Sequence, residues 1–329
     1  MICSFGELLL RFSPPLNRKW ILDAMIPTYI GGAELNVAAA LACWGLPVRY
    51  CTRLPNHTLT QEIIGELQDQ QISLAIELGG ERIGTYYLPQ GADLKQSGVI
   101  YDRAHSAFSE LQVGMIDWKK LFTDCTHFHF SAINPSLNQQ VADVCIEAIG
   151  EAKLKSIPVS IDLNYRAKLW QYGKEPQEVM HPLIEQADIV MGNIWAAEQL
   201  LKIPSTIKNS QGKSKDELIQ AALQSMQLLL QKYQQVKTIA YTFRLDQIYF
   251  AVLHRQGQTV VSREFLLHQV VDKVGSGDCF MAGLLFGIQQ LQSPQQIIDF
   301  AASAAVGKMG EIGDQTKQTV NHILNRIGV

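Results

Sequence analysis

The sequence lacks a strong excess of charge of either sign. Its 28 basic and 31 acidic residues leave a formal net charge of −3. A protein that binds nucleic acid or an anionic membrane surface usually carries a marked basic excess. The composition therefore predicts that neither nucleic acid nor a membrane is a partner.

Long apolar runs and paired cysteines are also missing. No uninterrupted apolar run approaches the roughly 18 residues that a membrane-spanning helix needs. Residues 1–7 have neither the basic start nor the long apolar core of a secretory signal. The six cysteines form no C-x-x-C pair, and several stand in apolar runs, where a reduced cysteine behaves as a small hydrophobic residue. We therefore expect a cytoplasmic protein.

What the chain does have is length and apolar content. Its 329 residues allow one large domain or two ordinary ones, and its 47% hydrophobic content suffices for a sizeable core. Short β-branched or aromatic runs alternate with longer helical patterns. The predicted strands are 2–10, 48–53, 127–131, 159–163, 189–192, 238–243, 248–253 and 259–264. The predicted helices are 33–44, 61–70, 139–152, 216–233, 278–291 and 295–308.

This alternation predicts the fold class. Strands separated by helices of this length are typical of βαβ units, which give a mainly parallel sheet with helices on both faces. The last two predicted strands, 248–253 and 259–264, follow each other closely and are predicted to form an antiparallel hairpin. We therefore expect a three-layer α/β protein.

Two stretches interrupt the alternation. Residues 11–30 have little helical period, and residues 79–109 mix glycines with tyrosines. Segments of this kind are candidates for a lid over a ligand. No convincing repeat of 20–50 residues is present. We predict a single catalytic domain over residues 1–329, with lid segments near 11–30 and 79–109.

The sharpest feature of the sequence is the segment 272–280, in which Gly275, Ser276 and Gly277 precede Asp278 and an apolar helical run. The glycines let the backbone turn tightly beside a ligand. The start of the helix adds unpaired N–H donors and a partial positive charge. A transferring phosphoryl group carries the negative charge that such a corner stabilises. Asp278 would lie in the first helical turn, where a carboxylate can accept the proton of an attacking hydroxyl.

A plainer interpretation stays open from these residues alone. An aspartate in the first turn of a helix is usually a cap, and G-x-G-D by itself is a weak signal. The segment is not a Walker loop, because the Lys-Ser/Thr ending is missing, and it is not a complete G-x-G-x-x-G. The choice depends on the rest of the chain.

A family resemblance supplies that context. The segment 272–280 resembles the D-x-x-G-A-G-D-x-F signature of the ribokinase (pfkB-type) family of carbohydrate kinases, and residues 31–38 resemble its G-G-x-x-x-N-x-A turn. The resemblance implies a ribokinase-like three-layer fold with a small β lid, and the use of ATP and Mg²⁺. It also implies an anion hole at Gly275–Gly277, Asp278 as the catalytic base, and contacts from Gly32 and Asn36 to the sugar.

Two arginines suggest which sugar is bound. Arg103 stands in a lid segment, and Arg166 follows a predicted strand. Guanidinium pairs with carboxylate in bidentate fashion, and open α/β sheets bind ligands at strand ends. The pair therefore favours an acid sugar, although a structural ion pair for each arginine is the alternative.

The chain also resembles 2-keto-3-deoxygluconate kinases in residues 13–15, 52–55, 84–87, 101–107 and 162–166. The resemblance implies that the acid sugar is held by Tyr87, Tyr101, Arg103 and Arg166. It implies that the reaction is ATP-dependent phosphorylation of the terminal 6-hydroxyl.

Nucleotide and metal residues follow from the resemblance alone. The nucleotide candidates are Asn193, Thr242, Arg244, Gly307 and Gly313. The family's N-x-x-E stretch, which helps to organise Mg²⁺, is altered here, because Ala196 stands at the position of the glutamate. Glu198 is the metal candidate that remains nearby. Lid strands often pair between subunits in this family, which implies a homodimer through the lid.

Two other functions stay open at this point. One is a kinase of the same family that acts on a neutral sugar such as fructose or ribose, for which the two arginines would be dispensable. The other is a non-catalytic sugar- or nucleotide-binding protein on the same fold, because a fold does not fix a function.

Overall fold

The computed structural model describes residues 1–329 except 17–18, 23–24, 91–97, 268–269, 292 and 329. The strands are β1 (Ile2–Phe5), β2 (Leu9–Phe12), β3 (Thr28–Gly31), β4 (Val48–Leu54), β5 (Ser73–Leu78), β6 (Gly84–Tyr87), β7 (Ile100–Asp102), β8 (His127–Ser131), β9 (Val159–Asp162), β10 (Ile189–Gly192), β11 (Thr238–Arg244), β12 (Ile248–Arg255), β13 (Gln258–Val261) and β14 (Phe265–Leu266). The α-helices are α1 (Ala33–Cys43), α2 (Thr58–Asp69), α3 (Trp118–Leu121), α4 (Gln139–Leu154), α5 (Pro176–Ile184), α6 (Ile194–Leu201), α7 (Lys215–Lys232), α8 (Ser276–Gln290), α9 (Pro294–Lys308) and α10 (Val320–Ile327).

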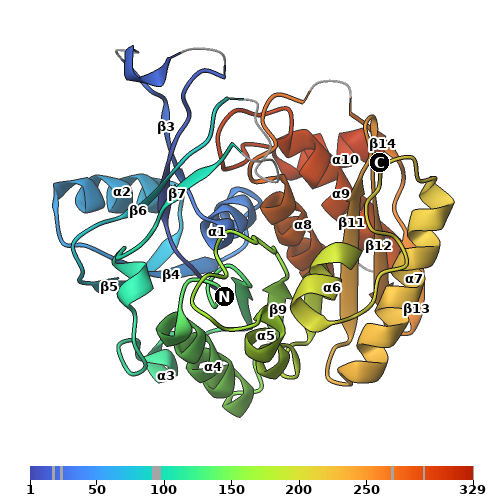
Figure 1. Cartoon of the computed structure of the whole chain (residues 1–329), viewed down its shortest axis with the longest axis horizontal. Coiled ribbons are helices and arrows are strands. Elements are labelled where there is room, and N and C mark those ends of the chain that lie inside the picture. The colour runs from blue at the N-terminus through green and yellow to red at the C-terminus, as the bar shows by residue number, and fades with distance from the viewer. Residues whose placement is uncertain (17–18, 23–24, 91–97, 268–269, 292, 329) are drawn as a thin grey trace.

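A ten-stranded sheet runs through the middle of the molecule in the order β13-β12-β11-β10-β9-β8-β1-β4-β5, with β14 paired to β12 (Figure 1). The strands from β5 to β11 in this order are parallel, and β12, β13 and β14 are antiparallel. The predicted mainly parallel sheet and its terminal hairpin are therefore confirmed.

Helices cover both faces of this sheet because its strands are apolar on both sides. Successive side chains of a strand point to opposite faces. In β1, Cys3 and Phe5 pack into the core beneath α3–α7, whereas Ile2 packs into the second core beneath α1, α2 and α8–α10. Such doubly buried strands are typical of parallel sheets. The result is the three-layer arrangement that the sequence predicts.

The prediction of one strand over residues 2–10 is wrong, because the chain leaves the main sheet at Gly6. The Gly6 backbone N–H still donates to the Cys51 carbonyl at 3.1 Å. A Cβ on Gly6 would lie 2.0 Å from Glu34 Oε2, so a larger residue here would displace the Glu34 side chain at the start of α1. After this point the chain enters a second sheet as β2.

The second sheet has four strands in the order β3-β2-β6-β7, and we refer to it as the small sheet. Figure 1 shows it extending beyond the main sheet near the N-terminal helices. Its strands overlap the two predicted lid segments, 11–30 and 79–109. Residues 17–18, 23–24 and 91–97 of those segments lie outside the described residues.

Several elements were not predicted. They are β3, β5, β6, β7 and β14, and the helices α3, α5, α6 and α10. Most of these elements are short, and short segments carry too few residues to display a period. Pro182 inside α5 also hides that helix, because proline removes a helical hydrogen-bond donor.

Candidate functional site

The start of α8 forms a tight corner that only glycine can make. Gly275 has a φ of 77°, in the left-handed region, and a Cβ there would lie 1.9 Å from the Asp314 carbonyl oxygen. Asp272 Oδ1 accepts a hydrogen bond from the Val274 backbone N–H at 3.0 Å. The Ser276 hydroxyl donates to the Lys273 carbonyl at 2.9 Å. The loop is therefore fixed by its own hydrogen bonds, which include one of 3.4 Å from the Ser276 backbone N–H to the Lys273 carbonyl. The first turn of a helix also offers N–H groups without an intrahelical partner, and these can bind an anion.

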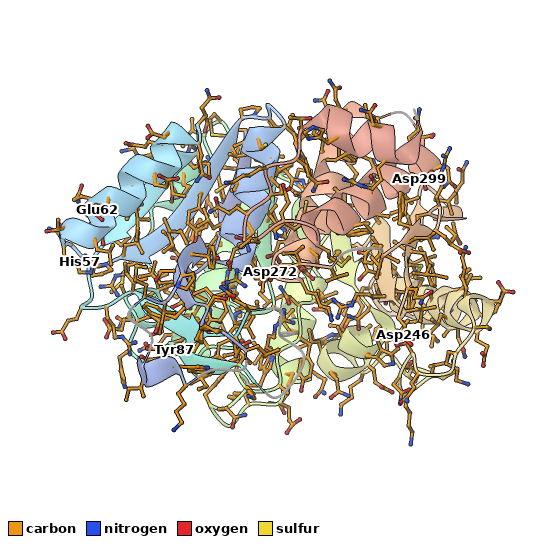
Figure 2. All side chains as sticks on the ribbon, turned by 90° about the horizontal axis from the view of Figure 1, so that it is seen from above. His57, Glu62, Tyr87, Asp246, Asp272 and Asp299 are labelled. Atoms are coloured by element: carbon orange, nitrogen blue, oxygen red, sulfur yellow. The ribbon has the colours of Figure 1, made fainter. Side chains whose placement is uncertain are left out.

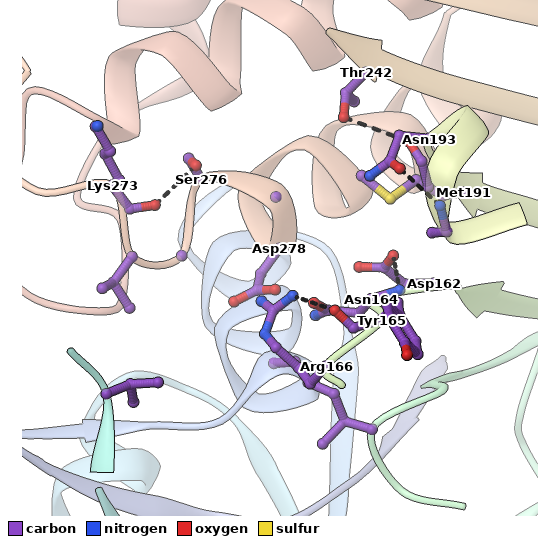
Figure 3. A pocket seen from close by; sticks show the side chains of 18 of the residues that line it. Asp162, Asn164, Tyr165, Arg166, Met191, Asn193, Thr242, Lys273, Ser276 and Asp278 are labelled. Carbon is purple, nitrogen blue, oxygen red and sulfur yellow. Dashed lines mark hydrogen bonds between the residues drawn. The ribbon is translucent and has the colours of Figure 1, made fainter. Parts of the chain in front are cut away.

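Asp278 lies in the first turn of α8 and is buried. The Asn36 side-chain amide donates a 2.7 Å hydrogen bond to Asp278 Oδ2. Burial raises the pKa of Asp278 to about 6, although the hydrogen bond from Asn36 and the charge of Arg166 act in the opposite direction. Figure 3 shows the Arg166 guanidinium beside the Asp278 carboxylate. A carboxyl group with this pKa is ionised at neutral pH and still able to take up a proton.

A cavity of about 900 Å³ opens in front of this corner. It lies at the carboxyl ends of β9, β10 and β11, where parallel sheets bind their ligands, and the small sheet forms another wall. Twelve predicted site residues share its lining. They are Gly32, Asn36, Tyr101, Arg103, Arg166, Asn193, Thr242, Arg244, Gly275, Ser276, Gly277 and Asp278. Four predicted residues do not line it, namely Tyr87, Gly307, Gly313 and Glu198.

Tyr87 lies outside the lining because neighbouring residues of a strand point to opposite faces. Its ring stacks on Phe12 with 5.2 Å between centroids. Tyr86, which the sequence analysis did not single out, lines the cavity instead and faces Tyr101 on the next strand. The pairing of Tyr86 with Tyr101 is a matter of strand register, which the sequence alone does not display.

The remaining three residues lie in other surroundings. Gly307 lines a second hollow of about 520 Å³ beside Leu266 and Val306. A Cβ on Gly313 would meet the Tyr29 ring at 3.2 Å. The Glu198 carboxylate accepts a hydrogen bond from the Ser205 backbone N–H at 3.2 Å, because it points toward the turn after α6 and not into the cavity.

The two predicted arginines both reach the cavity but differ in their partners. Arg103 Nε donates to Glu7 Oε2 at 2.6 Å, and its Nη2 also pairs with this carboxylate. The Ser106 hydroxyl donates to the other oxygen of Glu7. The charge of Arg103 is therefore neutralised inside the protein. Arg166 is half-buried, and its Nη1 donates to the backbone carbonyl of Tyr165.

A further carboxylate lines the cavity. Asp162, at the end of β9, is buried and accepts a hydrogen bond from the Asn164 backbone N–H at 3.0 Å. Burial raises the pKa of Asp162 to about 7, and the negative charge of Asp278 adds to the effect. The sequence signal that could have identified Asp162 as a site residue is the motif Asp162-Leu163-Asn164 at the end of a predicted strand.

Among the described residues, no group of three or more His, Cys, Asp or Glu side chains could hold a metal ion by itself. Mg²⁺ needs few protein ligands when it is carried by nucleotide phosphates, since water and phosphate oxygens complete its shell. One hard oxygen donor in the cavity is enough to fit such an ion, and Asp162 supplies it.

Comparison with known proteins agrees with this geometry. Residues 1–319 match the model of the pfkB family carbohydrate kinases. The chain belongs to the pfkB family of carbohydrate kinases. The predicted enzyme class is therefore confirmed, and a kinase of this family uses ATP.

Individual relatives cover the whole length of this carbohydrate kinase. The crystal structure of a 2-dehydro-3-deoxygluconokinase from Thermotoga maritima is 33% identical, covers 100% of this chain and 98% of its own, and superposes with a TM-score of 0.89. A PfkB family carbohydrate kinase structure from Listeria grayi is 28% identical with a TM-score of 0.87, covering 100% and 99%. A 2-dehydro-3-deoxygalactonokinase of Haloferax volcanii is 24% identical over 98% of this chain and 95% of its own. The ribokinase-like fold is thus confirmed.

In the part of the chain that the structure describes, no helix of this kinase is long and apolar enough to cross a membrane.

Proposed function

We propose that this carbohydrate kinase transfers the γ-phosphoryl group of ATP to the terminal 6-hydroxyl of 2-keto-3-deoxygluconate. The observation that carries the proposal is the buried Asp278 carboxylate, held by Asn36 at the mouth of the glycine corner and flanked by Arg166. The Thermotoga maritima relative bears the name of this activity. A site for this sugar needs a base for the 6-hydroxyl and a cation for the acid group, and the lining of the cavity contains both in Asp278 and Arg166.

The chemistry follows from the positions of the groups. Asp278 accepts the proton of the sugar hydroxyl as its oxygen attacks the phosphorus, and the bond from phosphorus to the bridging oxygen of ADP breaks. The proton stays on the Asp278 carboxyl until it is lost to solvent. The backbone N–H groups of Gly275 and Gly277 take the charge of the transferred group, with no side chain to obstruct them at either glycine. The Ser276 N–H donates at 3.4 Å to the Lys273 carbonyl within the loop.

The sugar is held at the small-sheet end of the cavity. Asn36 Oδ1 is buried and has no hydrogen-bond partner among the described residues, so it can accept from a sugar hydroxyl. Tyr101 and Arg103 line the same region. Arg166 is the arginine that we assign to the carboxylate, because the charge of Arg103 already has a buried partner.

The nucleotide occupies the other end of the cavity. Asn193, Thr242 and Arg244 lie there, at the ends of β10 and β11. Bound Mg²⁺ would neutralise charge on the phosphates, and Asp162 would hold it through oxygen. Gly307 lines the second hollow and not this cavity, so we do not assign it to the nucleotide. Since ATP is the proposed phosphoryl donor, we also propose a cytoplasmic location.

The small sheet would serve as the lid of a single catalytic domain that spans residues 1–329. Large apolar side chains at its margin are exposed, with Ile21 at 93% and Met25 at 86%. Apolar surface of this kind favours association, so we propose a homodimer through the lid. Light scattering after gel filtration would measure the mass, and a monomer at micromolar concentration would contradict this part of the proposal.

A neutral sugar is the second candidate, and the Glu7–Arg103 ion pair favours it. If Arg103 is neutralised, one of the two cations that suggested an acid sugar is lost. With a neutral substrate, Arg166 would bind the phosphates instead. Its position beside Asp278 is also close to where the phosphates would lie.

A coupled assay of ADP release separates the candidates. The purified protein with ATP and Mg²⁺ would be given 2-keto-3-deoxygluconate, its galacto epimer, fructose and ribose. Arg166→Gln should raise the KM for the acid sugar roughly 10- to 100-fold, the cost of losing a charged hydrogen-bonded pair of about 1.5–3 kcal/mol. Turnover on fructose or ribose alone would discard the acid-sugar proposal and retain the kinase.

A further inference from the structure

The side chain of Arg11, in β2, is among the largest that are fully buried, with 1% of its surface exposed. Its Nη2 and Nη1 donate to the two oxygens of Asp272 at 2.7 and 3.3 Å. Its Nε lies 2.8 Å from Asp314 Oδ1, and the guanidinium lies 4.6 Å from the centroid of the Tyr29 ring. One guanidinium therefore joins two aspartates that are 42 residues apart in the sequence, from Asp272 to Asp314.

The register of the small sheet brings residues of three strands together beside these aspartates. Arg11 lies opposite Tyr29 of β3 on one side and opposite Tyr86 of β6 on the other. Opposed residues of neighbouring strands project from the same face. The Tyr86 hydroxyl donates to Asp314 Oδ2 at 2.8 Å. Tyr86 thus donates a hydrogen bond to one oxygen of the Asp314 carboxylate, and Arg11 Nε forms an ion pair with the other oxygen without meeting hydrogen-bond geometry.

The two aspartates in turn hold the backbone of the anion corner. Asp272 accepts from the Val274 N–H at 3.0 Å and from the Gly313 N–H at 3.3 Å. The carbonyl of Asp314 lies where a Cβ of Gly275 would be. Figure 2 shows Asp272 near the middle of the molecule, between the helices of the N-terminal and C-terminal parts. A shift of either aspartate would move the N–H groups that face the cavity.

We propose that Arg11 is a positioning residue for phosphoryl transfer, which ties the small sheet to the anion corner at Gly275–Gly277. This inference rests on the proposed phosphoryl transfer at that corner. The planar fork of arginine engages Asp272 with two nitrogens and Asp314 with the third, whereas the point charge of a lysine cannot do both. A buried ion pair is a poor source of stability. The role of this ion pair is instead to fix the backbone N–H donors of the corner in advance, because donors that are already in place stabilise developing charge without reorganisation.

The test compares Arg11→Lys with Arg49→Lys. Arg49 also forms a two-pronged pair with an aspartate, Asp124, at 2.7 and 3.2 Å, but it stands near the start of β4 and away from the cavity. Arg11→Lys should lower kcat roughly 10- to 100-fold, because outright removal of an oxyanion donor costs about 10²- to 10³-fold and a displaced donor costs less. The KM values for sugar and ATP should change little. Arg49→Lys should leave kcat and both KM values unchanged.

A second readout reports on the corner itself. Titration calorimetry would measure ADP with Mg²⁺, alone and with aluminium fluoride and the best sugar, since the planar fluoride mimics the transferring phosphoryl group. In Arg11→Lys, ADP alone should bind as in the wild type. The extra affinity brought by aluminium fluoride should fall at least about tenfold, in line with the lost transition-state stabilisation. A structural role would not separate these two affinities.

Several outcomes would overturn the inference. A folded Arg11→Lys variant with wild-type kcat would do so, and so would a loss of kcat that only follows the loss of folded protein in circular dichroism. If Arg11→Lys does not fold, Tyr86→Phe decides, since it removes one hydroxyl from Asp314 and leaves the ring. Its aluminium fluoride complex must be weakened, and an unchanged one overturns the proposal. A wild type without turnover on any of the four sugars overturns the proposed function itself, and this inference with it.

Discussion

The floor of the cavity and the small sheet carry charge in different ways. On the floor, Asp278 and Arg166 face the cavity side by side, and burial raises the pKa of Asp278 to about 6. At the small sheet, Arg11 of β2 and Arg103, which directly follows β7, are paired with buried carboxylates. The floor therefore keeps groups that can exchange protons and bind charge, whereas the small sheet offers shape and fixed distances. Substitutions in the two regions should therefore have different effects on activity and stability.

The largest effect is expected at the base. Asp278→Asn keeps the size of the side chain and its contact with Asn36 but cannot accept the proton. We expect kcat to fall about 10³-fold, within the range for removal of a general base. The coupled assay measures it, with the exposed Asp69→Asn at the end of α2 as a control. Full turnover by Asp278→Asn would remove Asp278 from the mechanism.

In the small sheet the effect should fall on stability. Arg103→Gln leaves Glu7 buried without its cation, and breaking such a pair costs about 3–5 kcal/mol of unfolding free energy. Urea denaturation would measure the loss. The double variant Glu7→Gln with Arg103→Gln removes both charges and should recover most of it. If Arg103→Gln is as stable as the wild type but binds the sugar poorly, Arg103 serves the ligand and not Glu7.

The pH dependence should have opposite signs for activity and stability. Because Asp278 must be ionised to act, kcat/KM should fall about tenfold for each pH unit below about 6. The pKa values of Glu34, Asp162 and Asp278 all lie above their ordinary values, chiefly because these groups are buried. Such groups contribute stability that is full below the unfolded pKa and is lost as the pH rises through about 6 to 7.

The contribution of these carboxyl groups should therefore make the protein more stable at pH 5 than at pH 7.5, although it is less active there. Thermal unfolding of wild type and Asp278→Asn at both pH values measures it. The variant should lose part of the difference and be stabilised mainly at pH 7.5. An unchanged difference in Asp278→Asn would show that Asp278 does not titrate in this range.

The smallest effect is expected at Tyr87. Its hydroxyl does not line the cavity, so Tyr87→Phe should change kcat/KM by about twofold or less. Tyr86→Phe, one residue away and on the opposite face, is the matched comparison and should have the larger effect. A tenfold rise in the sugar KM for Tyr87→Phe, without one for Tyr86→Phe, would return Tyr87 to the sugar site.

The sequence was informative where function rests on local backbone chemistry. The two glycines and the aspartate at 275–278 predict the corner, the helix start and the base together, because all three depend on neighbouring residues. The alternation of strands and helices likewise predicts the parallel sheet. Predicted helices such as 139–152 and 295–308 end within a few residues of α4 and α9.

What the sequence could not give depends on residues far apart in the chain. The strand predicted over 2–10 divides between two sheets, because Gly6 meets Glu34 of another element. Whether Tyr86 or Tyr87 faces the cavity depends on the register of β6 against β2 and β7.

The same limit applies to charge. Both Arg103 and Arg166 could be placed near a ligand from their motifs, yet only the fold brings Glu7 to Arg103 and Asp272 to Arg11. The sequence by itself determined the fold class and the glycine corner at the start of α8, since short-range geometry fixes them, and the role of Asp278 as base stays a prediction. The tertiary structure alone decided which charges are neutralised and which face the substrate, because electrostatic pairing depends on distance in space and not on separation along the chain.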